Sequence, residues 1–459
     1  MTECVVPRIV IGGVSSGAGK TVLSIGLMQS FKRRGLSVAP FKIGPDFIDP
    51  MFHRAVVGGP SRNLDSFLMN RQDILESFDR GCRGGDIAVV EGVMGLFDSV
   101  DATSEVGSTA EVAKILRAPV ILSVNVAKTA RSAAAVVQGF RDFDSELNLA
   151  GVVLNMVGSK RHRDKVTEAV EQLTGVEVVG ALPKTKELHL PERHLGLVPV
   201  HELKSDFQAL TSVVEEYVDV ERIIEIAGSA EPLALAETLR ESSTPEKTRV
   251  GVFLDDAFRF YYADTLSQLE TGANLIFIDS LRNKKLPAID SLYIGGGFPE
   301  VYASKLEKNK GFRNSVYDFC ATGGRVYGEC GGLMYLGESI STDAGEFEMT
   351  GFLPLETVMQ KRYVGMGYVI NQAACDSLLA GRGEVIRGHV FHHSKARLTG
   401  KADFAFKTLR GSGITEDRDG MIRENVLASY MHVHPLGCKG FIDGLINPPP
   451  DSEIKKQDQ

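Results

Sequence analysis

Short apolar segments alternate with longer segments of helical spacing along the first half of the chain. The apolar segments are rich in Val and Ile and predict five buried strands, at Arg8–Gly12, Ser37–Lys42, Ile87–Glu91, Val120–Asn125 and Leu149–Asn155. Segments of helical length follow them, the first at Lys20–Arg34. Strands of a parallel sheet are covered on both faces and are therefore apolar throughout. The alternation predicts an α/β fold with a doubly wound parallel sheet.

The pattern weakens between residues 219 and 247, which are rich in Ala, Ser and charged residues, and then resumes. Four further strands are predicted at Arg249–Leu254, Asn274–Ile278, Ser291–Gly295 and Arg325–Gly328. We therefore expect two α/β domains, at residues 1–225 and 248–446, joined by a linker at 226–247. Residues 447–459 are polar and rich in proline, which predicts a disordered tail.

Composition narrows the classes of function. The 459 residues carry a formal net charge of -8, which disfavours a nucleic-acid or anionic-membrane surface. Six cysteines are widely spaced without a C-x-x-C pair, so a reducing compartment fits better than a disulfide framework or a zinc cluster. We expect no signal peptide and no membrane span. The expectation is a cytoplasmic protein with neither a nucleic-acid nor a membrane partner.

A glycine-rich segment with the spacing G-x5-G-K-T joins the first strand to the first helix. Backbone N–H groups in such a loop point at phosphate oxygens, and the helix N-terminus adds a positive dipole. A strand before and a helix after the loop favour this interpretation over an accidental turn. The residues expected to bind the phosphates of ATP are Gly13, Ser16, Gly17, Gly19, Lys20 and Thr21. Thr21 is also expected to bind Mg²⁺.

Acidic residues follow two of the predicted strands. Glu91 ends a buried strand at the edge of the sheet where ligands bind, and is the leading expected Mg²⁺ ligand. Asp98 lies in the same loop with weaker support. Lys42 ends another strand and precedes Asp46 and Asp49 in a loop stiffened by prolines. We expect Lys42 to bind phosphate, Asp46 to bind Mg²⁺, and Asp49 to lie near substrate, although a turn with ordinary charges has the same spacing.

Asn155 closes a further predicted strand. Its amide suits an adenine edge, but asparagine is equally common as a turn residue at the end of a strand. The two readings are left open.

The second half contains a cysteine between a predicted strand and a helix, in GGRVYGECGGLMYLG. A tight turn there projects Cys330 as a nucleophile, and the next backbone N–H, at Gly331, helps to bind an oxyanion. Gly296 or Gly297, in YIGGGFPE, is the candidate second donor. A general base is expected at His432 or His434, in ASYMHVHP.

Three further histidines, in the segment GHVFHHS, have the composition of a metal site. No carboxylate or further spaced ligand completes a metal-binding pattern, so metal binding is disfavoured there. These residues are His389, His392 and His393.

Taken together, the motifs resemble the cobyrinic acid a,c-diamide synthase family, which includes the nickel-sirohydrochlorin a,c-diamide synthases. The resemblance covers nearly the whole chain. It is carried, in order, by GGVSSGAGKT, PFKIGPDFIDP, SRNLDSF, EGVMGLFD, LPERHLGLVP, YIGGGFPE, GECGGLMYLG and ASYMHVHP.

The resemblance implies a dethiobiotin-synthetase-like ATP domain followed by a flavodoxin-like class I glutaminase domain of the cobalamin type. It also implies that ATP and Mg²⁺ convert the a and c acetate carboxylates of an anionic metallo-tetrapyrrole to acyl phosphates. Ammonia released from L-glutamine at Cys330 then displaces phosphate. Such a reaction belongs to cobalamin biosynthesis, or to coenzyme F430 biosynthesis in methanogenesis.

The family pattern favours a dyad of Cys330 and His432. Class I glutaminases usually have a Glu two residues after the catalytic His, where this chain has His434. His434 and a backbone carbonyl are the candidates for orienting His432. The alternative functions are amidation of other side chains, as in cobyric acid synthase, and a P-loop switch ATPase with an inactive glutaminase-like module. The choice of macrocycle and a homodimeric state are left open.

Overall fold

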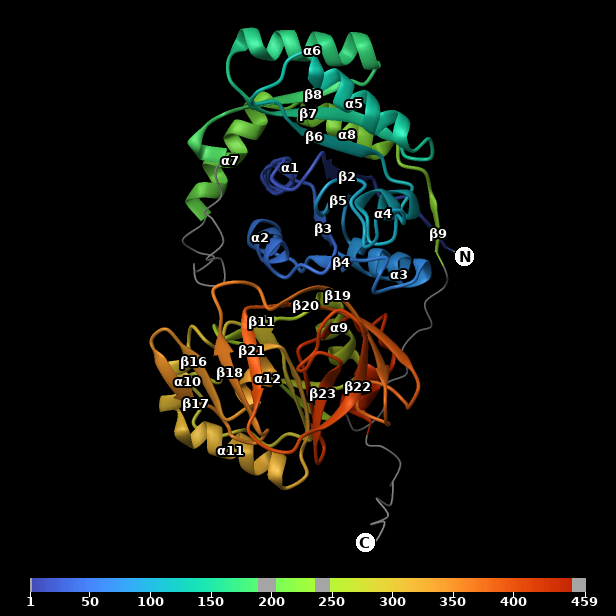
Figure 1. Cartoon of the computed structure of the whole chain (residues 1–459). Helices are drawn as coiled ribbons and strands as arrows, with labels where there is room; N and C mark the ends of the chain where they lie inside the picture. Colours follow the sequence, from blue (N-terminus) through green and yellow to red (C-terminus); the bar gives the residue numbers. More distant parts are fainter. Residues whose placement is uncertain (1, 189–203, 236–247, 448–459) are drawn as a thin grey trace. The chain divides into compact units, whose positions relative to one another are not determined.

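The chain divides into two compact units, residues 1–239 and 240–459 (Figure 1). The computed structural model describes residues 2–188, 204–235 and 248–447. The predicted tail from residue 448 onward, and residues 236–247 of the predicted linker, lie outside the described residues. Among the described helices, none combines the length and the apolar character needed to cross a bilayer.

The first unit contains a seven-stranded parallel sheet in the order β4-β3-β5-β2-β6-β7-β8. Its strands are β2 (Arg8–Gly13), β3 (Val38–Ile43), β4 (Arg62–Leu64), β5 (Ile87–Glu91), β6 (Val120–Asn125), β7 (Leu149–Val157) and β8 (Val178–Pro183). The five predicted strands are confirmed. The sequence analysis missed β4, which is short and polar, and β8, whose apolar pattern is interrupted by glycine and proline.

Helices cover both faces of this sheet, because right-handed crossovers lead in one direction from β2 to β4 and in the opposite direction from β4 to β8. One apolar cluster joins the sheet to α1 (Lys20–Arg33), α2 (Ile48–Val57), α7 (Lys204–Tyr217) and α8 (Val220–Gly228). The crossovers place on the opposite face α3 (Arg71–Cys82), α4 (Thr109–Ile115), α5 (Ser132–Phe143) and α6 (Lys160–Thr174).

The first unit extends beyond residue 225, where the sequence analysis ended the ATP domain. Ile223, Ile226 and Ala227 of α8 are buried in the apolar cluster. Strand β9 (Leu233–Leu235) then pairs antiparallel with β1 (Thr2–Cys4). Residues 226–235 are therefore part of the first unit and not of a linker. The Ala-, Ser- and charge-rich composition around this helix concealed its apolar side in the sequence.

The second unit contains a ten-stranded sheet in the order β12-β10-β13-β15-β24-β23-β22-β19-β20-β25. Its first five strands are parallel and have the 2-1-3-4-5 order of flavodoxin-like folds. They are β10 (Arg249–Phe253), β12 (Asn274–Ile278), β13 (Ser291–Ile294), β15 (Arg325–Glu329) and β24 (Val426–Ser429). The four predicted strands are among these, and the predicted flavodoxin-like core is confirmed.

The other half of this sheet is antiparallel. It consists of β19 (Gly365–Ala373), β20 (Val385–His392), β22 (Asp403–Arg410), β23 (Arg418–Arg423) and β25 (His432–Val433). A four-stranded sheet is formed by β16 (Ser339–Thr342), β17 (Gly345–Glu348), β18 (Leu355–Met359) and β21 (Ser394–Leu398), and a ribbon by β11 (Phe258–Phe260) and β14 (Gly296–Gly297). The helices are α9 (Ala263–Gly272), α10 (Ala303–Lys308), α11 (Lys310–Ala321), α12 (Gly331–Leu336) and α13 (Gly440–Ile446).

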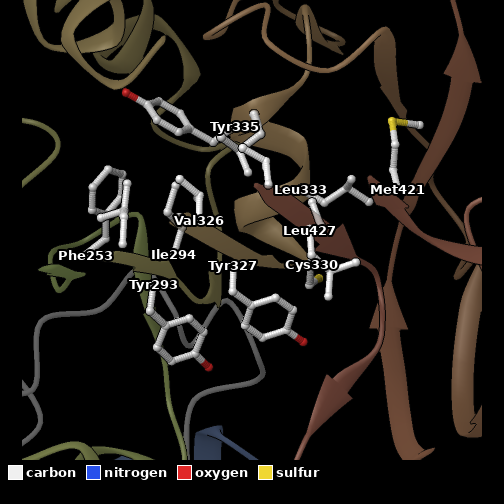
Figure 2. Close-up of a cluster of buried hydrophobic side chains, with 14 of the residues drawn as sticks. Phe253, Tyr293, Ile294, Val326, Tyr327, Cys330, Leu333, Tyr335, Met421 and Leu427 are labelled. Carbon is white, nitrogen blue, oxygen red and sulfur yellow. The ribbon is translucent and has the colours of Figure 1, made fainter. Parts of the chain in front are cut away.

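The core of the second unit reaches the end of β15. Cys330 lies there, among buried side chains of the neighbouring strands and of α12 (Figure 2). Tyr293 and Tyr327, on the paired strands β13 and β15, stack with 5.7 Å between ring centroids. The nucleophile candidate is therefore supported by the rigid, parallel half of the sheet.

Candidate active sites

The glycine-rich loop between β2 and α1 is held by side chains from neighbouring strands. Gly19 precedes α1 with φ +100°, and a Cβ atom on it would lie 2.1 Å from Nδ2 of Asn155. Ser123 Oγ and Asn155 Nδ2 donate hydrogen bonds to the carbonyl oxygen of Ala18, at 2.8 and 2.9 Å. Glycine is required at position 19 because both the conformation and the close approach exclude a side chain.

Lys20 lies within the curve of this loop. Its Nζ donates hydrogen bonds to the carbonyl oxygens of Ser15, at 3.1 Å, and of Met94. Burial, assisted by the charge of Lys42, lowers the pKa of Lys20 to about 8. An anion at the loop would raise this pKa again, because a further negative charge beside the ammonium favours its charged form.

Glu91 is the centre of a buried polar cluster at the carboxyl ends of β3 and β5. Thr21 Oγ1 donates to Glu91 Oε1 at 2.6 Å, and Lys42 Nζ approaches the same oxygen at 2.9 Å. His53 Nε2 donates to Glu91 Oε2 at 2.8 Å, and Lys42 also pairs with Asp49 at 2.6 Å. Two predicted residues from separate segments, Thr21 and Lys42, therefore converge on Glu91, and Asp49 joins through Lys42.

The charges of this cluster are coupled. Burial disfavours the charged form of Glu91, but the charge of Lys42 and the hydrogen bond from His53 outweigh it and lower the pKa of Glu91. Burial and the neighbouring charge of Glu91 raise the pKa of Asp49 well above its usual range. Burial opposes the charge on Lys42, yet Glu91 and Asp49 raise its pKa. One lysine thus lies between two carboxylates, of which Glu91 remains ionised.

His53 is the member of this cluster that sequence reasoning missed. It lies inside α2, is completely buried, and its Nδ1 is 3.0 Å from Ser61 Oγ. The available signal was a histidine on the buried side of a helix that follows the acidic loop. A buried histidine needs polar partners, and the nearby strand end supplies them.

The remaining acidic candidates have local partners. Asp46 Oδ1 accepts hydrogen bonds from the N–H groups of Ile48, at 2.7 Å, and Asp49, at 3.2 Å, at the start of α2. Asp98 Oδ2 accepts from the N–H of Gly95 at 2.7 Å. Both carboxylates shape the loops on which they lie.

A cavity of about 530 Å³ adjoins the glycine-rich loop. Asn155 lines it, while its Oδ1 accepts a hydrogen bond from the N–H of Met156 at 2.8 Å. The amide that suggested an adenine contact is thus also a structural support of the loop. The lining residues are Gly17, Gly19, Val22, Asn125, Asn155, Met156, Lys184, Thr185, Lys186 and Leu188.

Cys330 occupies a strained turn between β15 and α12. Its φ is +47° and ψ -94°, a conformation that non-glycine residues rarely adopt. Its N–H donates to the carbonyl oxygen of Ser429 at 2.7 Å, and the residue is 5% exposed. At Gly332 a Cβ atom would lie 2.2 Å from the carbonyl oxygen of Ile294. The predicted elbow is therefore present, and the second glycine after the cysteine permits it.

His432 is hydrogen-bonded to Cys330 and is 1% exposed. Burial alone would lower its pKa, but the hydrogen bonds with Cys330 and Glu329 outweigh this effect and raise the pKa to about 10. A Cβ atom at Gly296 would lie 2.5 Å from the imidazole ring. The predicted pair of cysteine and histidine is assembled from two distant segments.

Two glycine backbones meet beside the cysteine. The backbone N of Gly297 lies 3.2 Å from the position that a Cβ atom of Gly331 would occupy. Gly296 instead lies against the imidazole of His432. Gly331 and Gly297 are thus adjacent, as two donors to one oxyanion must be.

Of the candidates for orienting His432, His434 has other neighbours, and the carboxylate beside His432 belongs to Glu329, which was not among those candidates. His432 Nδ1 is 3.3 Å from Glu329 Oε2, within a buried pair. His434 Nε2 lies 3.6 Å from Asp264, and its ring centroid is 4.8 Å from that of Tyr262. Alternation along the extended chain places the side chains of His432 and His434 on one face, but it does not show which residues contact each histidine.

The other histidines pack against separate aromatic rings. His389 stacks on His432 with 4.9 Å between centroids, His392 stacks on Tyr430 at 3.8 Å, and His393 lies 4.1 Å from the ring of Tyr363. Within the described parts of the chain, no three His, Cys, Asp or Glu side chains are grouped to bind a metal ion.

Comparisons with known proteins assign each half of the chain to a domain family. Residues 9–198 match the CobQ/CobB/MinD/ParA nucleotide binding domain, and residues 249–438 match the CobB/CobQ-like glutamine amidotransferase domain. A cobyrinate a,c-diamide synthase of Archaeoglobus fulgidus is 52% identical over 95% of this chain and 96% of its own length. The chain belongs to the cobyrinate a,c-diamide synthase family. Members from Methanothermobacter thermautotrophicus and Methanosarcina acetivorans are 41% and 39% identical, covering 95% and 96% of this chain and 97% and 95% of their own.

Membership of the cobyrinate a,c-diamide synthase family unites the two halves of the chain. The glycine-rich loop and Glu91 lie in the nucleotide-binding domain, and Cys330 and His432 lie in the glutamine amidotransferase domain. This combination performs glutamine-dependent amidation. The motif LPERHLGLVP, residues 190–199, lies outside the described residues.

Proposed function

We propose that this protein uses ATP and glutamine to amidate the a and c acetate carboxylates of a tetrapyrrole macrocycle, with cobyrinate as the favoured substrate. The observation that carries the proposal is the hydrogen-bonded pair of Cys330 and His432, in a chain that also holds Lys20 and Glu91 at a glycine-rich loop. The printed names of the relatives support cobyrinate, and those from Archaeoglobus fulgidus, Methanothermobacter thermautotrophicus and Methanosarcina acetivorans carry the same name.

The nucleotide-binding domain activates the substrate carboxylate. Hydroxide is a poor leaving group, so transfer of the γ-phosphoryl group to the carboxylate forms an acyl phosphate that ammonia can displace. The loop and Lys20 hold the phosphates, and the adjoining cavity has room for a nucleoside. The oxygens of Thr21 and Glu91 are 2.6 Å apart and are of the type that Mg²⁺ prefers, so these residues would hold the ion. Bound there, Mg²⁺ would neutralise phosphate charge.

The glutaminase domain supplies ammonia. The Cys330 thiolate attacks the side-chain amide carbon of glutamine, and the backbone N–H groups of Gly331 and Gly297 bind the oxyanion. His432 gives a proton to the departing nitrogen, which leaves as ammonia, and water then hydrolyses the thioester. A binding module without catalysis has no need of a strained cysteine paired with a buried histidine.

The test offers cobyrinate and nickel-sirohydrochlorin separately, with ATP, Mg²⁺ and glutamine, and follows the mass of each macrocycle. Each amidation replaces OH by NH₂, so two successive losses of about one mass unit are expected. The Cys330→Ser variant should lose the glutamine-dependent reaction and retain amidation with ammonium. Brisk ATP hydrolysis with neither macrocycle changed would contradict the proposal. Cobyrinate a,c-diamide is offered in a further reaction, and its conversion with cobyrinate unchanged would favour a cobyric acid synthase.

A further inference from the structure

Glu329, the residue before the cysteine, has four hydrogen-bond donors around its carboxylate. Tyr293 Oη donates to Oε2 at 2.8 Å, and His432 Nδ1 is 3.3 Å from the same oxygen. Tyr327 Oη and the backbone N–H of Val433 donate to Oε1 at 3.1 and 3.2 Å. Glu329 is 1% exposed. Each of the two carboxylate oxygens of Glu329 therefore has two donors.

The sheet holds this carboxylate in one position. Side chains alternate along a strand, so Tyr327 and Glu329 leave β15 on the same face, and Tyr293 is the direct partner of Tyr327 on β13. The hydroxyl groups of the two tyrosines point the same way (Figure 2). Phe441 of α13 packs edge-on against both rings, with centroids 5.3 and 5.2 Å away. The network is thus covered by apolar packing.

We propose that Glu329 is the positioning residue of the glutaminase site: its carboxylate holds His432 in the catalytic tautomer and stabilises the imidazolium that forms when the ring takes the thiol proton. This inference rests on the proposed function of Cys330. A hydrogen bond from Nδ1–H to Glu329 leaves Nε2 for the thiol. The thiol proton moves to Nε2, forming thiolate and imidazolium. That proton then goes to the amide nitrogen as the C–N bond breaks and the S–C bond remains.

The charge balance around His432 depends on Glu329. Cys330 is its partner at the elbow, and His389 and His392 of β20 are the further titratable groups near it. Burial and the charge of His432 lower the pKa of His389 well below 6.5, and burial lowers that of His392 to about 4. These histidines are therefore neutral near pH 7. The groups that raise the pKa of His432 are Cys330 and Glu329.

The tyrosines act as neutral donors. Burial and the charge of Glu329 raise the pKa of both Tyr293 and Tyr327 well above 10. Replacing one tyrosine therefore removes a hydrogen bond without removing a charge. Tyr327→Phe is accordingly the matched control for Glu329→Gln, which removes the charge while keeping the shape of the side chain.

The experiment measures ammonia release from glutamine across pH 5–11 for the full chain and its variants. Glu329→Gln should lower kcat/KM at pH 7 by about tenfold or more, with KM little changed, since Glu329 acts through His432. The alkaline limb of the profile should move to lower pH, because the imidazolium loses the carboxylate that raises its pKa. Tyr327→Phe should leave the position of the limb unchanged. An unmoved limb in Glu329→Gln would overturn the proposal and leave Glu329 a structural role.

Two further results keep the test decisive. Glu329→Asp retains the charge but shortens the side chain, so it should keep the wild-type limb and lose rate; wild-type kcat in this variant would overturn positioning, even if Glu329→Gln does not fold. Ammonium-dependent amidation should be retained in each folded variant. Absence of ammonia release from the wild type would count against the proposed function at Cys330, a result distinct from an unmoved limb.

Discussion

The second site contains a residue with a strained backbone, Cys330, and a buried carboxyl, that of Glu300, whose ionisation opposes folding. Glu300 ends the segment GGGFPE, and Pro299 beside it approaches the position of a Cβ atom on Gly331 within 3.1 Å. Burial raises the pKa of Glu300 to about 7. A carboxyl whose pKa is higher in the folded state favours the protonated form, so its ionisation works against folding.

Replacing Glu300 by Gln should therefore stabilise the protein increasingly as pH rises above about 4.5. Below the usual pKa of about 4.5 the carboxyl is protonated in both states and costs nothing. The penalty grows as pH rises and is complete above pH 7, at no more than about 3.5 kcal/mol, because one pKa unit is worth about 1.4 kcal/mol. Thermal unfolding at pH 4.5 and pH 8 measures it. The exposed Glu416→Gln is the control, and equal effects of Glu300→Gln at both pH values would contradict the prediction.

Residues whose chemistry follows from their neighbours in the chain were predictable, whereas those defined by tertiary contacts were not. Cys330 was found because the glycines after it permit the turn. His53 and Glu329 were missed because each meets its partners only after separate strands pair: Glu329 needs β13, β24 and β25 around β15. The neighbours of His434 were not predictable, since alternation gives a face and not a partner.

At the scale of elements, the parallel strands were predictable and the antiparallel ones were not. Continuous apolar runs mark strands covered on both faces, as in β5, whose residues are all buried. Strands such as β19 alternate between buried and exposed positions and contain glycine, which weakens the signal. The junction of β2 and α1 was predictable because its glycines satisfy a local conformational requirement.

Gly19→Ala should test that junction. The substitution places a Cβ atom at φ +100° and within 2.1 Å of Asn155, so it strains the loop and breaks the Asn155 hydrogen bond to Ala18. A loss of about 1–3 kcal/mol of stability and weaker ATP binding are expected. Gly139→Ala in α5 is the matched control, since nothing lies within 4 Å of its Cβ and alanine favours a helix interior by about 1 kcal/mol. Calorimetry measures the stability of each variant, and nucleotide titration measures its ATP affinity. Unchanged ATP affinity in Gly19→Ala would refute the assignment of this loop to phosphate binding.

At the scale of the whole molecule, the chain has two units with separate apolar cores and separate chemistry. A ligand stabilises only the cooperative unit that binds it, by about 2.7 kcal/mol when its free concentration is 100 times Kd. A non-hydrolysable ATP analogue with Mg²⁺ should therefore raise the unfolding temperature of the unit that contains Lys20. Glutamine analogues that react with the Cys330 thiol should change the unfolding temperature of the unit that contains Cys330.

Differential scanning calorimetry of the full chain should resolve these responses. With the analogue and Mg²⁺, the transition of the first unit should move upward by several degrees, while that of the second stays in place. Lys20→Ala should abolish the shift, because the lysine that faces the phosphates is gone, whereas Cys330→Ser should retain it. A shift of the second transition alone would contradict the prediction, because it would mean that the nucleotide binds to the second unit. A single transition that moves as a whole would show that the two cores unfold together, and the Lys20→Ala comparison would still decide where the nucleotide binds.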